Sequence, residues 1–184
     1  FFNYMNLLTA KDVYHMMLIK SSDNGKTWTS PEDITTQITQ PEWQNDFKFI
    51  TSGRGIQTQK GRLIHTLVNL QKGLFLFASD NHGKNWHLIE TRIKPADESK
   101  ITELVNGDWM VNSRVNDFGY RYVHTSTDEG KTWHSSPDSA LIDPGCNGSI
   151  LKYNMPNSTV NENVLLFINL KNKKTRENLT IRMS

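Results

Sequence analysis

The sequence has almost no cysteine, no long apolar run and almost no excess of either charge. Its one cysteine, Cys146, excludes a disulfide within the chain, so packing must stabilise the fold. No stretch approaches the roughly 18 consecutive apolar residues of a membrane-spanning helix. Lys and Arg number 21 against 19 Asp and Glu, and a net charge of +2 is too small to indicate binding to nucleic acid or to an anionic membrane. Any anion that the protein binds must be held by a few local residues.

Helical periodicity is also nearly absent. Only residues 31–48, where Glu32 and Asp33 follow a Ser-Pro pair, could hold a short helical turn, and we favour a long inter-strand loop there. The glycine pair around Arg54 lacks the G-x-G-x-x-G spacing of a dinucleotide-binding turn, and no helix follows it. No linker or low-complexity tract divides the chain, so we expect one domain over residues 1–184 and no nucleotide cofactor.

Short strand signals separated by turn residues account for most of the chain. The composition, 36% hydrophobic and 10% aromatic, is enough to form a buried core. Residues rich in β-branched and aromatic side chains recur between Gly, Asn and Asp clusters. They predict an all-β protein with strands at residues 14–19, 62–68, 74–77, 101–105, 109–115, 120–125, 149–153 and 164–169.

One eight-residue pattern occurs three times, as SSDNGKTW at 21–28, SDNHGKNW at 79–86 and STDEGKTW at 126–133. An ionised Asp can accept the backbone N–H groups of its own turn, Gly permits a positive φ, and Trp can bury a large ring against neighbouring strands. We therefore interpret each copy as a device that locks a turn. A single Asp followed by Gly and Lys lacks the ligands of a calcium loop, so we expect no metal site here.

This pattern, Ser-x-Asp-x-Gly-x-Thr-Trp, resembles the Asp box of sialidases and related β-propellers, although the second copy has Asn81 and Asn85 in the Asp and Thr positions. The three Trp residues are 58 and 47 positions apart, close to the roughly 40 to 50 residues of one propeller blade. At that length the chain would supply roughly four blades. A sialidase propeller has six, so the resemblance implies that this chain is an internal part of a larger catalytic domain, truncated at both ends.

Residues 97–114 carry the strongest hairpin signal, since Asn106-Gly107 separates two alternating runs. A two-residue turn would place Arg114 opposite Ser99, and a three-residue loop would place it opposite Lys100. Either register brings Glu98 and Arg114 to the same end of one hairpin. From spacing alone, an exposed ion pair of about 0 to 1 kcal/mol is the simplest interpretation.

The same hairpin is similar to a motif of bacterial exo-α-sialidases (neuraminidases), in which a Glu precedes an Arg by 16 positions, as Glu98 precedes Arg114. Two further segments are similar to that family. Residues 174–180 resemble its Arg-x-Asn-Gly/Leu-Thr segment, and residues 143–150 resemble its Cys-Gln-Gly-Ser-Ile turn, with Asn147 in place of Gln. The resemblance implies an enzyme that hydrolyses terminal α-linked sialic acid from glycoproteins, glycolipids and oligosaccharides, with sialylated glycans as its partners.

The resemblance also implies a role for each matching residue. Arg114 and Arg176 would bind the sialic acid carboxylate, Gln71 would contact the glycerol side chain, and Glu98 would take the proton of a tyrosine nucleophile. Glu103 is the competing candidate for the base. The family's first arginine, its acid/base Asp and its nucleophilic Tyr have no match in this chain, so we expect the isolated 184 residues to be inactive. Neither metal nor cofactor is implied.

Two other functions share parts of this pattern. Asp boxes also occur on non-catalytic propellers such as receptors and carbohydrate-binding modules, because a fold does not determine a function. A trans-sialidase, or a lyase of the same superfamily, would share the catalytic residues and differ in its product. The resemblance implies an extracellular or cell-surface location for any of these proteins.

Overall fold

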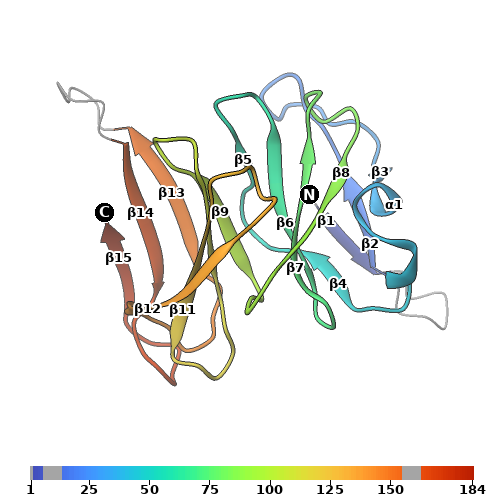
Figure 1. The fold of residues 1–184 in the computed structure, drawn as a ribbon. Helices are drawn as coiled ribbons and strands as arrows, with labels where there is room; N and C mark the ends of the chain where they lie inside the picture. The colour runs from blue at the N-terminus through green and yellow to red at the C-terminus, as the bar shows by residue number, and fades with distance from the viewer. Residues whose placement is uncertain (1, 6–13, 155–162) are drawn as a thin grey trace.

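The computed structural model describes residues 2–5, 14–154 and 163–184, which form four antiparallel β-sheets. Figure 1 shows the sheets side by side in chain order, from blue to red. The first sheet contains β1 (Phe2–Met5), β2 (Tyr14–Leu18) and β3 (Glu32–Asp33). The second contains β4 (Lys48–Ile50), β5 (Ile56–Gln57), β6 (Leu63–Asn69), β7 (Gly73–Ser79) and β8 (His87–Ile93).

The third sheet contains β9 (Ser99–Glu103), β10 (Trp109–Ser113), β11 (Tyr120–Ser126) and β12 (His134–Ile142). The fourth contains β13 (Ser149–Asn154), β14 (Asn163–Leu170) and β15 (Leu179–Met183). Each chain segment pairs mainly with its sequence neighbours, as in a propeller blade, and β9 contacts both β6 of the second sheet and β13 of the fourth. The all-β prediction is confirmed, and the arrangement of the sheets is that of a partial β-propeller.

The hydrophobic cores lie between successive sheets. Strand β7 is buried on both faces, and its side chains alternate between two cores because successive residues of a strand point to opposite faces. Phe75 and Phe77 pack toward the first sheet, whereas Leu74 and Leu76 pack toward the third. Because both faces of the strand enter a hydrophobic core, every residue from 74 to 77 is apolar.

Residues 31–48 are more ordered than the long loop that we favoured. They contain β3, a helical turn α1 (Thr35–Ile38) and a 3-10 turn η1 (Pro41–Trp43). The reason is burial: Ile34, Ile38 and Trp43 enter the core between the first two sheets, and the Trp43 ring centroid lies 4.5 Å from that of Phe75. Tertiary packing holds these short turns, which would be unstable in isolation.

The three eight-residue repeats have the geometry predicted from their sequence. In the third copy, Asp128 Oδ1 accepts a 2.8 Å hydrogen bond from the Ser126 hydroxyl and a 2.9 Å bond from the Thr132 N–H. The first copy reproduces these distances, and in the second copy the Asn81 amide oxygen takes the place of the carboxylate. These hydrogen bonds lower the pKa of both Asp23 and Asp128 to about 2.

The prediction that each repeat buries its Trp is wrong for the first copy. Trp86 is 8% exposed and packs into the core between the first two sheets, whereas Trp28 is 57% exposed. Trp28 belongs to the first sheet in the array, whose outer side faces no other sheet of the described residues. The motif therefore sets the turn, and the neighbouring sheet sets the burial of the ring.

Candidate active site

The hairpin β9–β10 closes through a three-residue loop at 105–107. The Leu104 N–H donates to the Asp108 carbonyl at 2.8 Å, and Gly107 takes the positive φ of 89° that ends such a loop. Ser113 pairs with Ser99, so Arg114 lies opposite Glu98. Both expected registers are wrong, because Gly107 occupies the last loop position and not a central one. The correction brings Glu98 and Arg114 closer together than either expected register.

Glu98 and Arg114 form a direct ion pair. Arg114 Nη1 donates to Glu98 Oε2 at 2.6 Å, and the Arg114 N–H donates to the Glu98 carbonyl at 3.1 Å. Both side chains are 22% exposed, so the pair is shielded but reaches solvent. Asn116 Oδ1 accepts a 2.7 Å bond from Arg114 Nε, and the amide of Asn116 donates to Asp97 at 2.9 Å. The guanidinium is thus held on two sides.

Gln71 lies at the same end of the sheets as this pair. At the other end of β9, Glu103 accepts a hydrogen bond from Gln59, which lies between β5 and β6. The start of β9 lies beside the middle of β6, because the Thr66 hydroxyl donates to the Ser99 carbonyl at 3.1 Å, and β6 runs on from there to its turn with β7, in which the Gln71 N–H donates to Asn69 Oδ1 at 3.0 Å. Hereafter the Glu98 end is the end of the sheets at which β9 begins and β10 ends.

Arg176 also lies at the Glu98 end, in the loop between β14 and β15. This loop contacts the third sheet through Lys173, which donates to the Tyr120 hydroxyl and lies 4.3 Å from the centroid of its ring. Tyr120 begins β11, at the end where β10 finishes. Among the described residues, neither Arg176 nor Gln71 is hydrogen-bonded to the Glu98–Arg114 pair, and both are exposed. The structure brings Glu98 and Arg114 into contact and places Gln71 and Arg176 on loops at the same end of the sheets.

A buried ionic cluster supports this end from beneath, and the sequence did not indicate it. Arg121 is fully buried, and its Nη1 lies 3.1 Å from Asp143 Oδ2. Asp143 also accepts the N–H groups of Gly145 and Cys146, and it receives a 2.9 Å bond from Asn169 of β14. The cluster joins the third and fourth sheets. Its sequence signal was only the isolated charge of Arg121 in an otherwise strand-like run.

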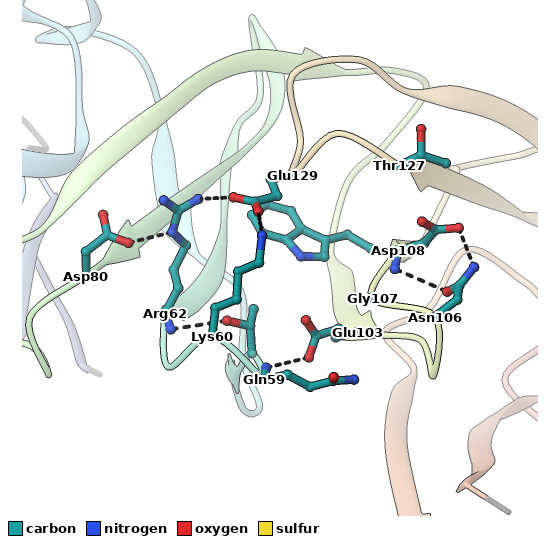
Figure 2. Close-up of a pocket in the computed structure, with 12 residues that line it drawn as sticks. Gln59, Lys60, Arg62, Asp80, Glu103, Asn106, Gly107, Asp108, Thr127 and Glu129 are labelled. Atoms are coloured by element: carbon teal, nitrogen blue, oxygen red, sulfur yellow. Dashed lines mark hydrogen bonds and ion pairs between the residues drawn. The ribbon is translucent and has the colours of Figure 1, made fainter.

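Glu103, the competing candidate for the base, lies at the far end of β9 from Glu98. It lines a pocket of about 400 Å³, the residues of which are drawn in Figure 2. Glu103 is 8% exposed, and its Oε2 accepts the Gln59 N–H at 2.7 Å. In the same pocket, Arg62 Nε donates to Asp80 Oδ1 at 2.6 Å, and Arg62 Nη1 donates to Glu129 Oε2 at 3.3 Å. These bonds join turns of the second and third sheets, which indicates a structural role for Glu103.

In the described ranges, no three His, Cys, Asp or Glu side chains gather closely enough to hold a metal ion. No helix in the same ranges is long and apolar enough to cross a membrane.

Sheets arranged as successive blades, each of the first three with an Asp-box turn before its last strand, place the chain among the β-propellers. The family model that matches residues 3–184 is the BNR repeat-like domain, and the chain belongs to this family.

Similar curated proteins are sialidases. The sialidase of Micromonospora viridifaciens is 37% identical over 187 residues, covering 94% of this chain and 28% of its own length. The sialidase of Bacteroides fragilis (strain YCH46) is 32% identical over 176 residues, covering 92% of this chain and 32% of its own length. The chain therefore spans about a third of the length of these relatives.

Similar solved structures have the same fold. The Hadza microbial sialidase Hz136 is 29% identical with a TM-score of 0.76, covering 93% of this chain and 34% of that protein. The intramolecular trans-sialidase from Ruminococcus gnavus is 26% identical with a TM-score of 0.80, covering 94% of this chain and 36% of that protein.

Proposed function

We propose that the complete protein containing this chain is an exo-α-sialidase that releases terminal α-linked sialic acid from sialylated glycans. The observation that carries the proposal is the contact between Glu98 and Arg114 at 2.6 Å, within a domain similar to sialidases over most of its length. A carboxylate beside a guanidinium at one partly open end of the sheets offers both a base and an anion-binding group.

The substrate's anomeric carbon carries a carboxylate, and Arg114 is suited to bind it. Its planar guanidinium keeps its charge at any working pH and can bind a carboxylate through two parallel hydrogen bonds. Arg176, on the exposed loop after β14, would supply a second guanidinium. Gln71, in the β6–β7 turn, would contact the glycerol side chain of the sugar. Two arginines select an anionic sugar over a neutral one.

Glu98 would then serve as the base. A carboxylate nucleophile would approach the anomeric carbon against the charge of the substrate's own carboxylate, and a tyrosine avoids that repulsion. A phenol with a reference pKa near 10 needs a base at neutral pH. Glu98 accepts that proton in our proposal, while the tyrosine and the acid/base Asp come from parts of the protein outside this chain. An extracellular or cell-surface location belongs to the same proposal.

The test is an assay of the complete gene product on a fluorogenic α-sialoside, with the matching β-galactoside as a neutral control. We expect turnover of the sialoside only, with free sialic acid as the product identified by mass spectrometry. An anhydro sugar, formed when a hydroxyl of the sialic acid replaces water, would instead show an intramolecular trans-sialidase. Binding of sialosides without any product would show a non-catalytic propeller, and both results contradict the proposed hydrolase.

A further inference from the structure

Lys100 lies next to the Glu98–Arg114 pair along the β9–β10 hairpin. It follows Glu98 by two positions and pairs with Asn112 of β10, while the backbone N–H of Arg114, two positions after Asn112, donates to the Glu98 carbonyl. Lys100 is 3% exposed, and its ammonium group donates to the Ser52 carbonyl in the turn between β4 and β5. The turn fits closely around it, since a Cβ on Gly53 would lie 3.2 Å from Lys100 Cε. One lysine thus connects the Glu98 strand to the second sheet.

Among the described residues, three charged or titratable groups interact electrostatically with this ammonium group. Glu98, just before β9, attracts it and raises its pKa, whereas Arg121 of β11 repels it and lowers its pKa. Burial is the largest cause, and the resulting pKa of Lys100 is about 8. His65 of β6 is the third group, and the charge of Lys100 contributes to lowering its pKa. Lys100 is therefore still mostly charged at neutral pH.

We propose that Lys100 is a positioning residue for Glu98, supplying a second positive charge that keeps this carboxylate ionised and in place when the substrate occupies Arg114. The inference rests on the proposed function. Arg114 holds Glu98 in the structure, but a substrate carboxylate would compete for the same guanidinium. Lys100 is too deeply buried to be drawn to the substrate, so its charge stays beside Glu98 throughout.

The first test compares pH profiles of kcat/KM for the complete gene product and its Lys100→Met and Lys100→Arg variants. Methionine keeps an unbranched stem and removes the charge, which makes the nearby carboxylate easier to protonate. We expect Lys100→Met to move the acid limb upward by about half a pH unit or more, while Lys100→Arg leaves the limb near its original position. Lys84→Met, on an exposed lysine of the second Asp box, is the control and should leave the profile unchanged. An unmoved limb in Lys100→Met, or the same shift in both Lys100 variants, overturns the inference.

The second measurement does not depend on turnover. NMR titration of ¹³Cε-labelled lysine should show that Glu98→Gln lowers the Lys100 midpoint below its wild-type value, because the attraction between them is lost. An unchanged midpoint overturns the inference whatever the activity. A lowered midpoint in a protein that releases no sialic acid supports the Lys100–Glu98 coupling and overturns the proposed hydrolase alone. If Lys100→Met does not fold, Lys100→Gln takes its place.

Discussion

Asp128 shows how one carboxylate can organise one turn. It accepts hydrogen bonds from Ser126, from the Thr132 N–H and from the Thr132 hydroxyl at 2.6 Å. In the second repeat, the amide oxygen of Asn81 makes the first two of these bonds at nearly the same distances. The backbone of the turn therefore needs an acceptor at this position, and the third bond needs both the second carboxylate oxygen and a Thr hydroxyl, which the second copy replaces with Asn81 and Asn85.

We predict that Asp128→Asn destabilises the protein less than Asp128→Ala does. The amide oxygen can still accept the bonds from the Ser126 hydroxyl and the Thr132 N–H, whereas alanine removes the acceptor altogether. The folded pKa of Asp128 is lowered to about 2 from 3.8, so the carboxylate's contribution is present above about pH 4 and is lost as the pH falls toward 2. Thermal unfolding at pH 7 and pH 3 measures both effects. Equal melting temperatures for the two variants at pH 7 would contradict the prediction.

Between elements, Arg121 and Asp143 form the most deeply buried ion pair of the described residues. Arg121 belongs to β11, Asp143 follows β12, and Asn169 of β14 bonds to the same carboxylate. Removing one partner from a buried pair leaves an uncompensated charge, which costs more than the pair itself contributes. The joint between the third and fourth sheets should therefore be sensitive to a change at Asp143.

We predict that Asp143→Asn lowers the free energy of unfolding by about 3 to 5 kcal/mol. The amide oxygen can still accept the N–H groups of Gly145 and Cys146, so the loss reports chiefly the missing charge beside Arg121. Urea denaturation measures the effect, with exposed Asp117→Asn as a control that should change stability by less than about 0.5 kcal/mol. A loss below about 1 kcal/mol in Asp143→Asn would show that the charge of Asp143 does not stabilise the joint.

The comparison of sequence with structure is clearest at this scale. Short-range signals predicted the strands and the hairpin that joins Glu98 to Arg114, because those contacts depend on neighbours in the chain. The predicted strand register of this hairpin was wrong, because the position that Gly107 takes in the loop depends on the backbone conformation there. The bonds from Lys100 to Ser52 and from Asn169 to Asp143 could not be predicted, since they depend on how separate sheets pack.

At the scale of the whole molecule, two buried histidines, His65 and His124, make the folded protein less stable in mild acid. Burial lowers the pKa of both His65 and His124 to about 4, from 6.5. Between these values the unfolded chain binds protons that the folded protein does not, so stability falls as the pH decreases from about 6.5 to 4. Each histidine can account for up to about 3 kcal/mol of this loss at pH 4.

We predict that the melting temperature decreases steadily from pH 7 to pH 4.5 and that His124→Gln makes this decrease shallower. Glutamine removes the titrating group while keeping a polar side chain opposite Ser135, the hydroxyl of which lies 2.7 Å from His124 Nδ1. His82→Asn is the matched control, because His82 is exposed in the turn of the second Asp box. The pH dependence should be unchanged in this control. An identical slope in His124→Gln would show that His124 does not cause the acid sensitivity.

The central claim is that the Glu98 end of the sheets is the catalytic end of the protein. Its most direct test is kcat on an α-sialoside for Glu98→Gln and Glu103→Gln, measured side by side in the complete gene product. We predict that Glu98→Gln lowers kcat by about 10²- to 10⁴-fold, as expected for loss of a general base, while correctly folded Glu103→Gln stays near the wild-type value. Near-normal turnover in Glu98→Gln together with loss of activity in folded Glu103→Gln would contradict the account and move the active site to the pocket of Figure 2.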